Sequence, residues 1–131
     1  MRPIQVVAAV IERGGRLLLG LRPAEKRHGG LWEFPGGKLD GAETAAEAAH
    51  RELKEELSVV VTAVGERLTT IREEGSPFVI EFYPVVVEGE PKAIEHKEVR
   101  WFSLDELSEY SLAPADTAFA TWLAADRLRE V

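Results

Sequence analysis

The stretch that most constrains this chain is residues 44–57, which predict a helix with carboxylates along one face. Thr44 is a good helix cap, and Glu47 follows three residues later, which is the spacing of a capping box. From there to Leu57 the chain has no glycine or proline and consists mostly of good helix formers. An apolar stripe recurs at helical spacing: Ala46, Ala49, Leu53 and Leu57. One side of this helix is therefore expected to pack against a core.

Three glutamates of this helix break local rules of helix stability. Glu52, Glu55 and Glu56 stand at positions i, i+3 and i+4, so they share one face. Like charges four residues apart destabilise a helix by about 0.2–0.5 kcal/mol, and the C-terminal half of a helix favours cations. Two interpretations follow from these residues alone. The face is either a solvated charged surface or a site for a hard cation, which carboxylate oxygens suit.

The full spacing from Gly37 to Val59 resembles the signature of the Nudix hydrolase family. All but one of the fixed positions match: Gly37, Glu43, Arg51, Glu52, Leu53, Glu55, Glu56 and Val59. The departure is Ser58, where the family has glycine. A glycine there ends the helix, commonly in a left-handed conformation. Ser58 is therefore expected to strain the helix end without removing a metal ligand.

The resemblance implies a fold, a reaction and a metal site. Nudix proteins share an α/β/α sandwich around a mixed β-sheet, and MutT-like members hydrolyse a nucleoside triphosphate to the monophosphate and pyrophosphate. At matching positions, the implied ligands of Mg²⁺ (or Mn²⁺) are the Gly36 carbonyl, Glu52, Glu55 and Glu56. The implied catalytic residues are Glu52, Glu55, Arg51 and Glu95, with Glu52 or Glu95 taking a proton and Arg51 paired to Glu43.

The substrate expectation rests on segments outside the signature. Residues 31–37 and 112–116 are similar to those of MutT-like pyrophosphohydrolases, and with residues 22–24 they look closest to members acting on CTP. The predicted substrate-binding residues are Arg22, Phe34, Lys38 and Asp116. An ionised Asp116 only accepts hydrogen bonds, and the cytosine N4 amino group donates them. This favours CTP or dCTP. Asp116 also has the chemistry of a helix N-cap, and the two roles could coexist.

Other functions remain open at this stage. One is hydrolysis of 8-oxo-dGTP or a broad range of nucleotides, and another is hydrolysis of nucleoside-diphosphate sugars, which share the signature. A non-catalytic nucleotide-binding Nudix module is a further alternative. Such modules usually lose carboxylates of the signature, whereas Glu52, Glu55 and Glu56 are all present here. The enzyme is therefore the favoured interpretation.

Composition excludes several classes of partner. With 131 residues the chain predicts a single domain over 1–131. A net charge of −7 argues against a nucleic-acid polymer as partner, since such proteins carry basic patches. The absence of cysteine rules out disulfides and thiolate sites. No long apolar run follows Met1, which favours a cytoplasmic protein without a membrane partner. The expected oligomeric state is a monomer or a homodimer.

The remaining pattern predicts an α+β domain with helices on both faces of its sheet. Apolar and β-branched runs predict strands at 5–12, 17–21, 59–64, 68–72, 78–87 and 99–102. The first two strands are expected to form a hairpin, Gly36 and Gly37 a turn, and Pro84 an edge position or bulge. A brief helix is expected at 104–107 and a final helix at 116–130.

Overall fold

The computed structural model describes residues 2–129 of the chain, so the end of the predicted helix at Glu130 lies outside the described residues. Two α-helices and one short 3-10 helix accompany the strands of the described part: α1 (Ala45–Leu57), α2 (Pro114–Arg129) and Asp105–Glu109. The strands are β1 (Ile4–Val10), β2 (Glu12–Arg13), β3 (Arg16–Leu21), β4 (Trp32–Glu33), β5 (Gly36–Lys38), β6 (Val60–Val64), β7 (Thr69–Arg72), β8 (Phe78–Glu88) and β9 (Glu98–Phe102).

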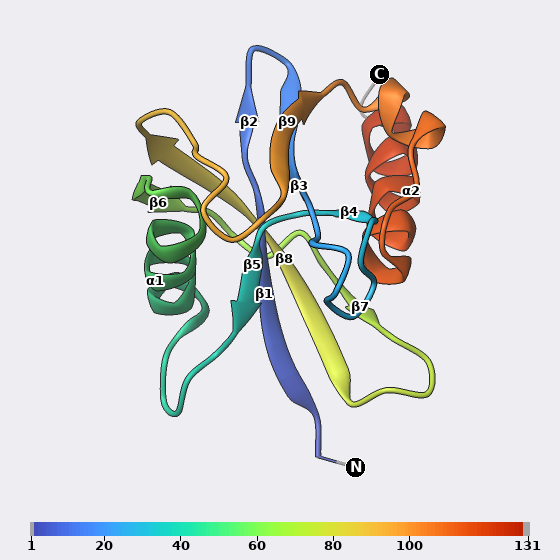
Figure 1. Cartoon of the computed structure of the whole chain (residues 1–131). Coiled ribbons are helices and arrows are strands. Elements are labelled where there is room, and N and C mark those ends of the chain that lie inside the picture. The colour runs from blue at the N-terminus through green and yellow to red at the C-terminus, as the bar shows by residue number, and fades with distance from the viewer. Residues whose placement is uncertain (1, 130–131) are drawn as a thin grey trace.

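The strands form two sheets between two helices, and Figure 1 shows α1 and α2 on opposite sides of them. The larger sheet has the order β5-β1-β8-β6, with β7 also paired to β8. The smaller one has the order β2-β3-β4, with β9 paired to β3. Strands β1 and β8 are parallel and the other pairs are antiparallel. The predicted fold class, an α+β chain with a mixed sheet in an α/β/α sandwich, is confirmed.

Alternating side chains of β1 contribute to separate cores. Ala8 and Val10 belong to the cluster that contains Phe119 of α2. Ala9 belongs to the cluster that contains Leu53 of α1. Because successive residues of a strand point to opposite faces, one apolar strand can serve both helices. This explains why the first strand is apolar along most of its length rather than alternating.

Helix α1 begins as its sequence predicts. The Thr44 hydroxyl accepts a hydrogen bond from the Glu47 backbone N–H at 3.1 Å, and the Glu47 carboxylate accepts one from the Thr44 N–H at 2.9 Å. The capping box is therefore complete. The apolar stripe differs at one position: Ala46 is exposed, whereas Ala48 is buried beside Ala49 and packs with Val7.

Two expectations about the first strands are wrong. Strand β1 pairs with β5 and β8, and only the short β2 forms the hairpin with β3. The pair Gly36-Gly37 is not a turn but part of β5, which lies antiparallel to β1. Gly36 has φ +152°, and a Cβ there would overlap the carbonyl oxygen of Val7. The glycine is needed for close approach of two strands, a demand that its sequence does not distinguish from a turn.

Pro84 lies in a central strand rather than at an edge. It falls between the part of β8 that pairs with β7 and the part that pairs with β6, opposite Val10 at the end of β1. A bulge interrupts the register of the β6–β8 pair between Val61 and Ala63. Pro84 has no N–H to donate, and it is tolerated where the pairing of β8 changes from β7 to β6.

Ser58 ends α1 in the left-handed conformation, with φ 57° and ψ 38°, and its N–H donates to the Lys54 carbonyl at 3.1 Å. A non-glycine residue is strained there. We expect Ser58→Gly to raise the free energy of unfolding by about 1 kcal/mol. Urea denaturation measures the change, with Ser58→Ala as control because it keeps the Cβ atom. A Gly variant no more stable than the Ala variant would contradict this account.

Candidate active site

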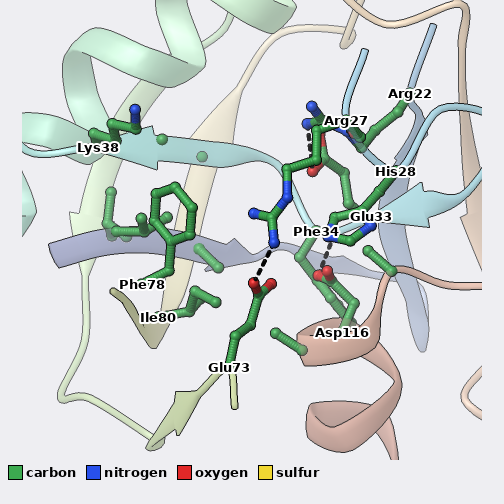
Figure 2. A pocket seen from close by; sticks show the side chains of 17 residues that line it. Arg22, Arg27, His28, Glu33, Phe34, Lys38, Glu73, Phe78, Ile80 and Asp116 are labelled. Atoms are coloured by element: carbon green, nitrogen blue, oxygen red, sulfur yellow. Dashed lines mark hydrogen bonds and ion pairs between the residues drawn. The ribbon is translucent and has the colours of Figure 1, made fainter. Parts of the chain in front are cut away.

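A cavity of about 340 Å³ opens between the loop that contains Arg27, strands β1 and β5, the start of β8 and the start of α2. All four residues predicted to bind substrate line it: Arg22, Phe34, Lys38 and Asp116. Gly36 and Gly37 line it as well. Figure 2 shows Lys38 and Asp116 at opposite sides of the cavity. The structure therefore places the beginning of the signature stretch and the proposed base-reading residue around one space.

Asp116 is a buried carboxyl at the third position of α2, not the cap of that helix. Its Oδ1 accepts a hydrogen bond from the Phe34 N–H at 2.9 Å, which joins α2 to the chain between β4 and β5 (Figure 2). Burial raises the pKa of Asp116 to about 8, against the lowering effect of the Phe34 N–H, and the charge of Glu33 adds to the rise. At neutral pH the group is therefore mostly protonated, contrary to the ionised form expected from sequence.

Arg22 is fixed at the cavity wall by Glu33. Its Nη1 donates to both carboxylate oxygens of Glu33, at 3.0 and 3.1 Å, and its Nε donates to the Arg27 carbonyl at 2.5 Å (Figure 2). Such charge-assisted pairs fix the orientation of a guanidinium. Arg22 therefore presents an oriented positive charge to whatever the cavity holds.

Several other residues at the cavity were not predicted from the sequence. Arg27 reaches across to Glu73 in an ion pair of 3.1 Å, and its guanidinium lies 5.2 Å from the Phe78 ring centroid (Figure 2). Lys38 lies on the same ring at 5.4 Å. His28 also lines the cavity, although a polar loop favours a solvated histidine. These residues come from segments far apart in the chain, so only the fold brings them together.

Glu52 and Glu56 turn the acidic face of α1 toward the interior. A Cβ on Gly37 would lie 2.5 Å from the Glu52 carboxyl carbon, so the glycine makes room for this side chain. Glu56 is only 5% exposed, and its Oε2 atom is buried without a hydrogen-bond partner. Burial, a hydrogen bond with Glu52 and the charges of Glu33 and Glu95 raise the pKa of Glu56 well above its ordinary range.

Arg51 ties the acidic face to the strand beside it. Its guanidinium donates to both oxygens of Glu43 at 2.8 and 2.9 Å, to Glu52 at 2.7 Å and to the Lys38 carbonyl at 3.1 Å. These bonds raise the pKa of Arg51, and they lower the pKa of Glu43 to about 2. Glu55 differs from Glu52: its side chain is 53% exposed and lies 3.5 Å from Arg51. Arg51 is therefore placed to orient the helix.

The buried carboxylates fit a divalent cation. An unpartnered oxygen on Glu56 and a raised pKa are what a cluster of like charges shows without a counter-ion. Within residues 2–129, no three carboxylate or imidazole groups are already gathered around one point as metal ligands. Arg51 occupies one oxygen of Glu52, and Glu55 lies outside the buried pair. The donor chemistry suits a hard cation, and its binding requires side chains to reorient.

The loop before β9 brings one predicted and one unpredicted residue to this cluster. Glu95 is exposed, and its charge contributes to the raised pKa of Glu56. The next residue, His96, is buried and lies 2.9 Å from a carboxylate oxygen of Glu33. The sequence offered one signal for His96, its position directly after Glu95, and that signal could not reveal its burial.

The comparisons identify the class of protein that this fold and site define. The NUDIX domain model matches residues 1–123, so the chain belongs to the NUDIX family. It is similar to the CTP pyrophosphohydrolase of Escherichia coli, at 44% identity over 88% of this chain and 87% of that protein. It is 32% identical to an 8-oxo-dGTP diphosphatase of Haemophilus influenzae, over 86% and 85%. The protein is therefore a Nudix hydrolase.

A solved structure supports the same class. The MutT NUDIX hydrolase of Burkholderia pseudomallei superposes with a TM-score of 0.82 at 30% identity, covering 92% of this chain and 98% of that one. Nudix hydrolases generally need a divalent metal ion, which agrees with the cluster of Glu52 and Glu56. No helix within residues 2–129 is long and apolar enough to cross a membrane.

The raised pKa of Asp116 predicts how stability depends on pH. Its folded-state pKa of about 8 exceeds the ordinary 3.8, so protonation favours the folded state, and that stability is lost as pH rises from 4 to 8. We expect Asp116→Asn to match the parent near pH 4, to gain stability relative to it by about 1.4 kcal/mol per pH unit from there to pH 8, and to show a constant difference above pH 8. Urea denaturation between pH 4 and 9 measures the difference, with the exposed Asp105→Asn as control. A difference that does not change with pH would refute the buried acid.

Proposed function

We propose that this protein is a Mg²⁺-dependent nucleoside triphosphate pyrophosphohydrolase that prefers cytosine nucleotides and forms the monophosphate and pyrophosphate. One observation carries the proposal: the same cavity is lined by Asp116, which has base-reading chemistry, and by Gly36 and Gly37 beside the acidic helix. A nucleotide spanning this cavity would have its base at Asp116 and its phosphates near Lys38. The E. coli relative named CTP pyrophosphohydrolase supports the same assignment.

The metal site is proposed on the acidic face of α1. Glu52, Glu55 and Glu56, with the Gly36 carbonyl, would hold Mg²⁺ (or Mn²⁺), and Arg51 keeps Glu52 in position. When bound, the ion neutralises charge on the phosphates and lowers the pKa of an attacking water. Glu52 or the exposed Glu95 is the proposed acceptor of the water proton.

The phosphates are proposed to meet two cationic side chains of the cavity, Lys38 and Arg22. Lys38 lies on the face of Phe78, and Arg22 is held in place by Glu33. Both side chains line the cavity together with Phe34, which packs edge-on against Phe82 and Phe119. Fixed charges in a partly closed site stabilise charge that develops during reaction more strongly than mobile ones. Positioning by these groups is therefore part of the proposed catalysis.

Base selection is proposed to depend on the proton of Asp116. A protonated carboxyl donates one hydrogen bond and accepts others, so it complements the N3 acceptor and N4 donor of cytosine together. Once ionised, the same group would face the lone pair of N3 with a second acceptor, which is unfavourable. The O6 and N1–H of a guanine also suit the protonated form, whereas N1–H and N2–H₂ suit the ionised form. The cytosine preference is therefore expected in the protonated enzyme.

A second candidate substrate is 8-oxo-dGTP. The protonated Asp116 can pair with O6 and N1–H, and the H. influenzae relative is named as an 8-oxo-dGTP diphosphatase. The Asp116 carboxyl is compatible with both bases, so relative kcat/KM values decide between them. A parent enzyme that prefers 8-oxo-dGTP by a wide margin would replace the cytosine assignment and leave the hydrolase intact.

Metal dependence is tested at Glu56. We expect activity with Mg²⁺ or Mn²⁺ and none with a chelator. Glu56→Gln should lower kcat by orders of magnitude, because it removes a charged ligand with little change of shape. The metal-free variant should be at least as stable as the parent, since an amide avoids the cost of a buried carboxylate among like charges. Glu66→Gln, on an exposed residue, is the matched control. Wild-type turnover in Glu56→Gln would contradict the proposed site.

Base selection is tested by pH. The ratio of kcat/KM for CTP to that for 8-oxo-dGTP should fall about tenfold for each pH unit above 8, because the Asp116 pKa lies near 8. Metal and phosphate effects on the two nucleotides cancel in this ratio. Asp116→Asn keeps one donor and one acceptor, so it should retain the preference and remove its dependence on pH. A parent ratio that stays constant from pH 7 to 9.5 would refute base reading by Asp116.

A further inference from the structure

A path of neighbouring side chains leads from the cavity to the acidic helix, and its inner members, His96 and Glu56, are buried. Arg22 donates to Glu33 at 3.0 and 3.1 Å, the Glu33 carboxylate lies 2.9 Å from the His96 Nε2 atom, and that atom lies 3.8 Å from Glu56 Oε1. The side chains of His96 and Glu56 are only 4% and 6% exposed. The path joins four segments of the chain: the residue that follows β3, strand β4, helix α1 and the loop before β9.

His96 has little freedom to move within this path. A Cβ on Gly20 would overlap the imidazole ring. The lack of a side chain at Gly20 therefore lets the ring pack directly against β3. The loop is also anchored to its neighbours by backbone bonds. Ile94 donates to the Glu56 carbonyl at 3.2 Å, Lys92 to the Leu57 carbonyl at 2.9 Å and Lys97 to the Leu21 carbonyl at 2.9 Å. The last turn of α1 and the loop that carries His96 are therefore held together.

The hydrogen-bond roles of the ring follow from its partners. A carboxylate oxygen of Glu33 accepts from Nε2, so Nε2 carries a proton. The other ring nitrogen, Nδ1, is buried and has no hydrogen-bond partner. His96 thus makes one directed bond, at the side of the ring that faces both Glu33 and Glu56. A purely space-filling residue would not need that donor.

We propose that His96 is a positioning residue: its Nε2–H holds Glu33 and keeps Glu56 oriented as a metal ligand, while Glu33 keeps Arg22 at the cavity wall. This inference rests on the metal-dependent hydrolysis proposed above. Groups that orient a metal ligand typically change metal affinity or activity by 10–100-fold when they are removed. His96 acts through Glu33 and Glu56 and needs no contact with substrate.

The test compares two amides at one position. His96→Gln can place its amide N–H₂ near the position of Nε2, whereas the shorter His96→Asn cannot reach Glu33. Neither amide titrates, so the comparison isolates the donor. His50→Asn, on the exposed side of α1, is the matched control. The measurements are Mn²⁺ binding to the nucleotide-free enzyme by electron paramagnetic resonance, and kcat and KM with CTP and Mg²⁺.

We expect His96→Asn to weaken Mn²⁺ binding and to lower kcat by 10–100-fold each. KM for CTP should stay within about threefold of the parent, because both bonds of the Arg22–Glu33 pair remain in this variant. His96→Gln and His50→Asn should stay within about threefold in all three quantities. His96→Leu serves as a second variant lacking the donor if the Asn protein does not fold. Circular dichroism of each variant confirms that a folded protein is compared.

Two results would overturn the role of His96 alone. The first is parent-like Mn²⁺ binding and kcat in a folded variant that lacks the donor. The second is equal losses in the Gln and Asn variants, which would indicate packing of the ring rather than its hydrogen bond. A parent enzyme that neither binds Mn²⁺ nor needs a metal for hydrolysis would instead overturn the proposed function, and this inference with it.

Discussion

Burial of Glu56 among other carboxylates is the constraint on which the site depends. An isolated ionised carboxylate in an apolar interior is so unfavourable that the group is paired or protonated instead. Here the buried Glu56 Oε2 atom has no hydrogen-bond partner, and burial beside other carboxylates raises the pKa of the group. Neighbouring Glu52 is neutralised by Arg51, which is also bonded to Glu43. The fold therefore places Glu52, which is paired with Arg51, beside Glu56, which lacks a full counter-charge. A bound divalent ion would supply the missing positive charge.

Local sequence rules predicted the helices and the longer strands of this fold, but not the short strands β4 and β5 and not the pairing of the strands. The capping box at Thr44 and the left-handed residue Ser58 depend on neighbours in the chain, so the sequence specified both ends of α1. Sheet pairing depends on distant partners. The run that begins the chain was predicted to pair with the next strand, whereas β1 lies between β5 and β8. Residue types in β1 predict a buried strand but carry no information about which strands lie beside it.

The candidate site could likewise be predicted only in part from the sequence. The resemblance at residues 22–24, 31–37 and 112–116, together with the signature stretch, was enough to name Arg22, Phe34, Lys38 and Asp116, and all four line the cavity. Their protonation and pairing could not be read from sequence. Tertiary burial raises the pKa of Asp116 to about 8, which favours the protonated group at neutral pH, and a protonated carboxyl can donate a hydrogen bond as an ionised aspartate cannot. His96 was missed because its environment is built from β3, β4 and α1.

Two strand glycines make room for polar side chains of the candidate site. At Gly37 a Cβ would meet the Glu52 carboxyl, and at Gly20 it would meet the His96 ring, so each glycine admits a polar side chain from another element to the surface of a strand. Strand glycines cost stability, because they lose more entropy on folding and contribute no packing. Here the cost coincides with the places where Glu52 of α1 and His96 of the loop before β9 pack against a strand. Larger residues at either position would push Glu52 or His96 away from Glu56, so the acidic cluster and these two glycines form one structural unit.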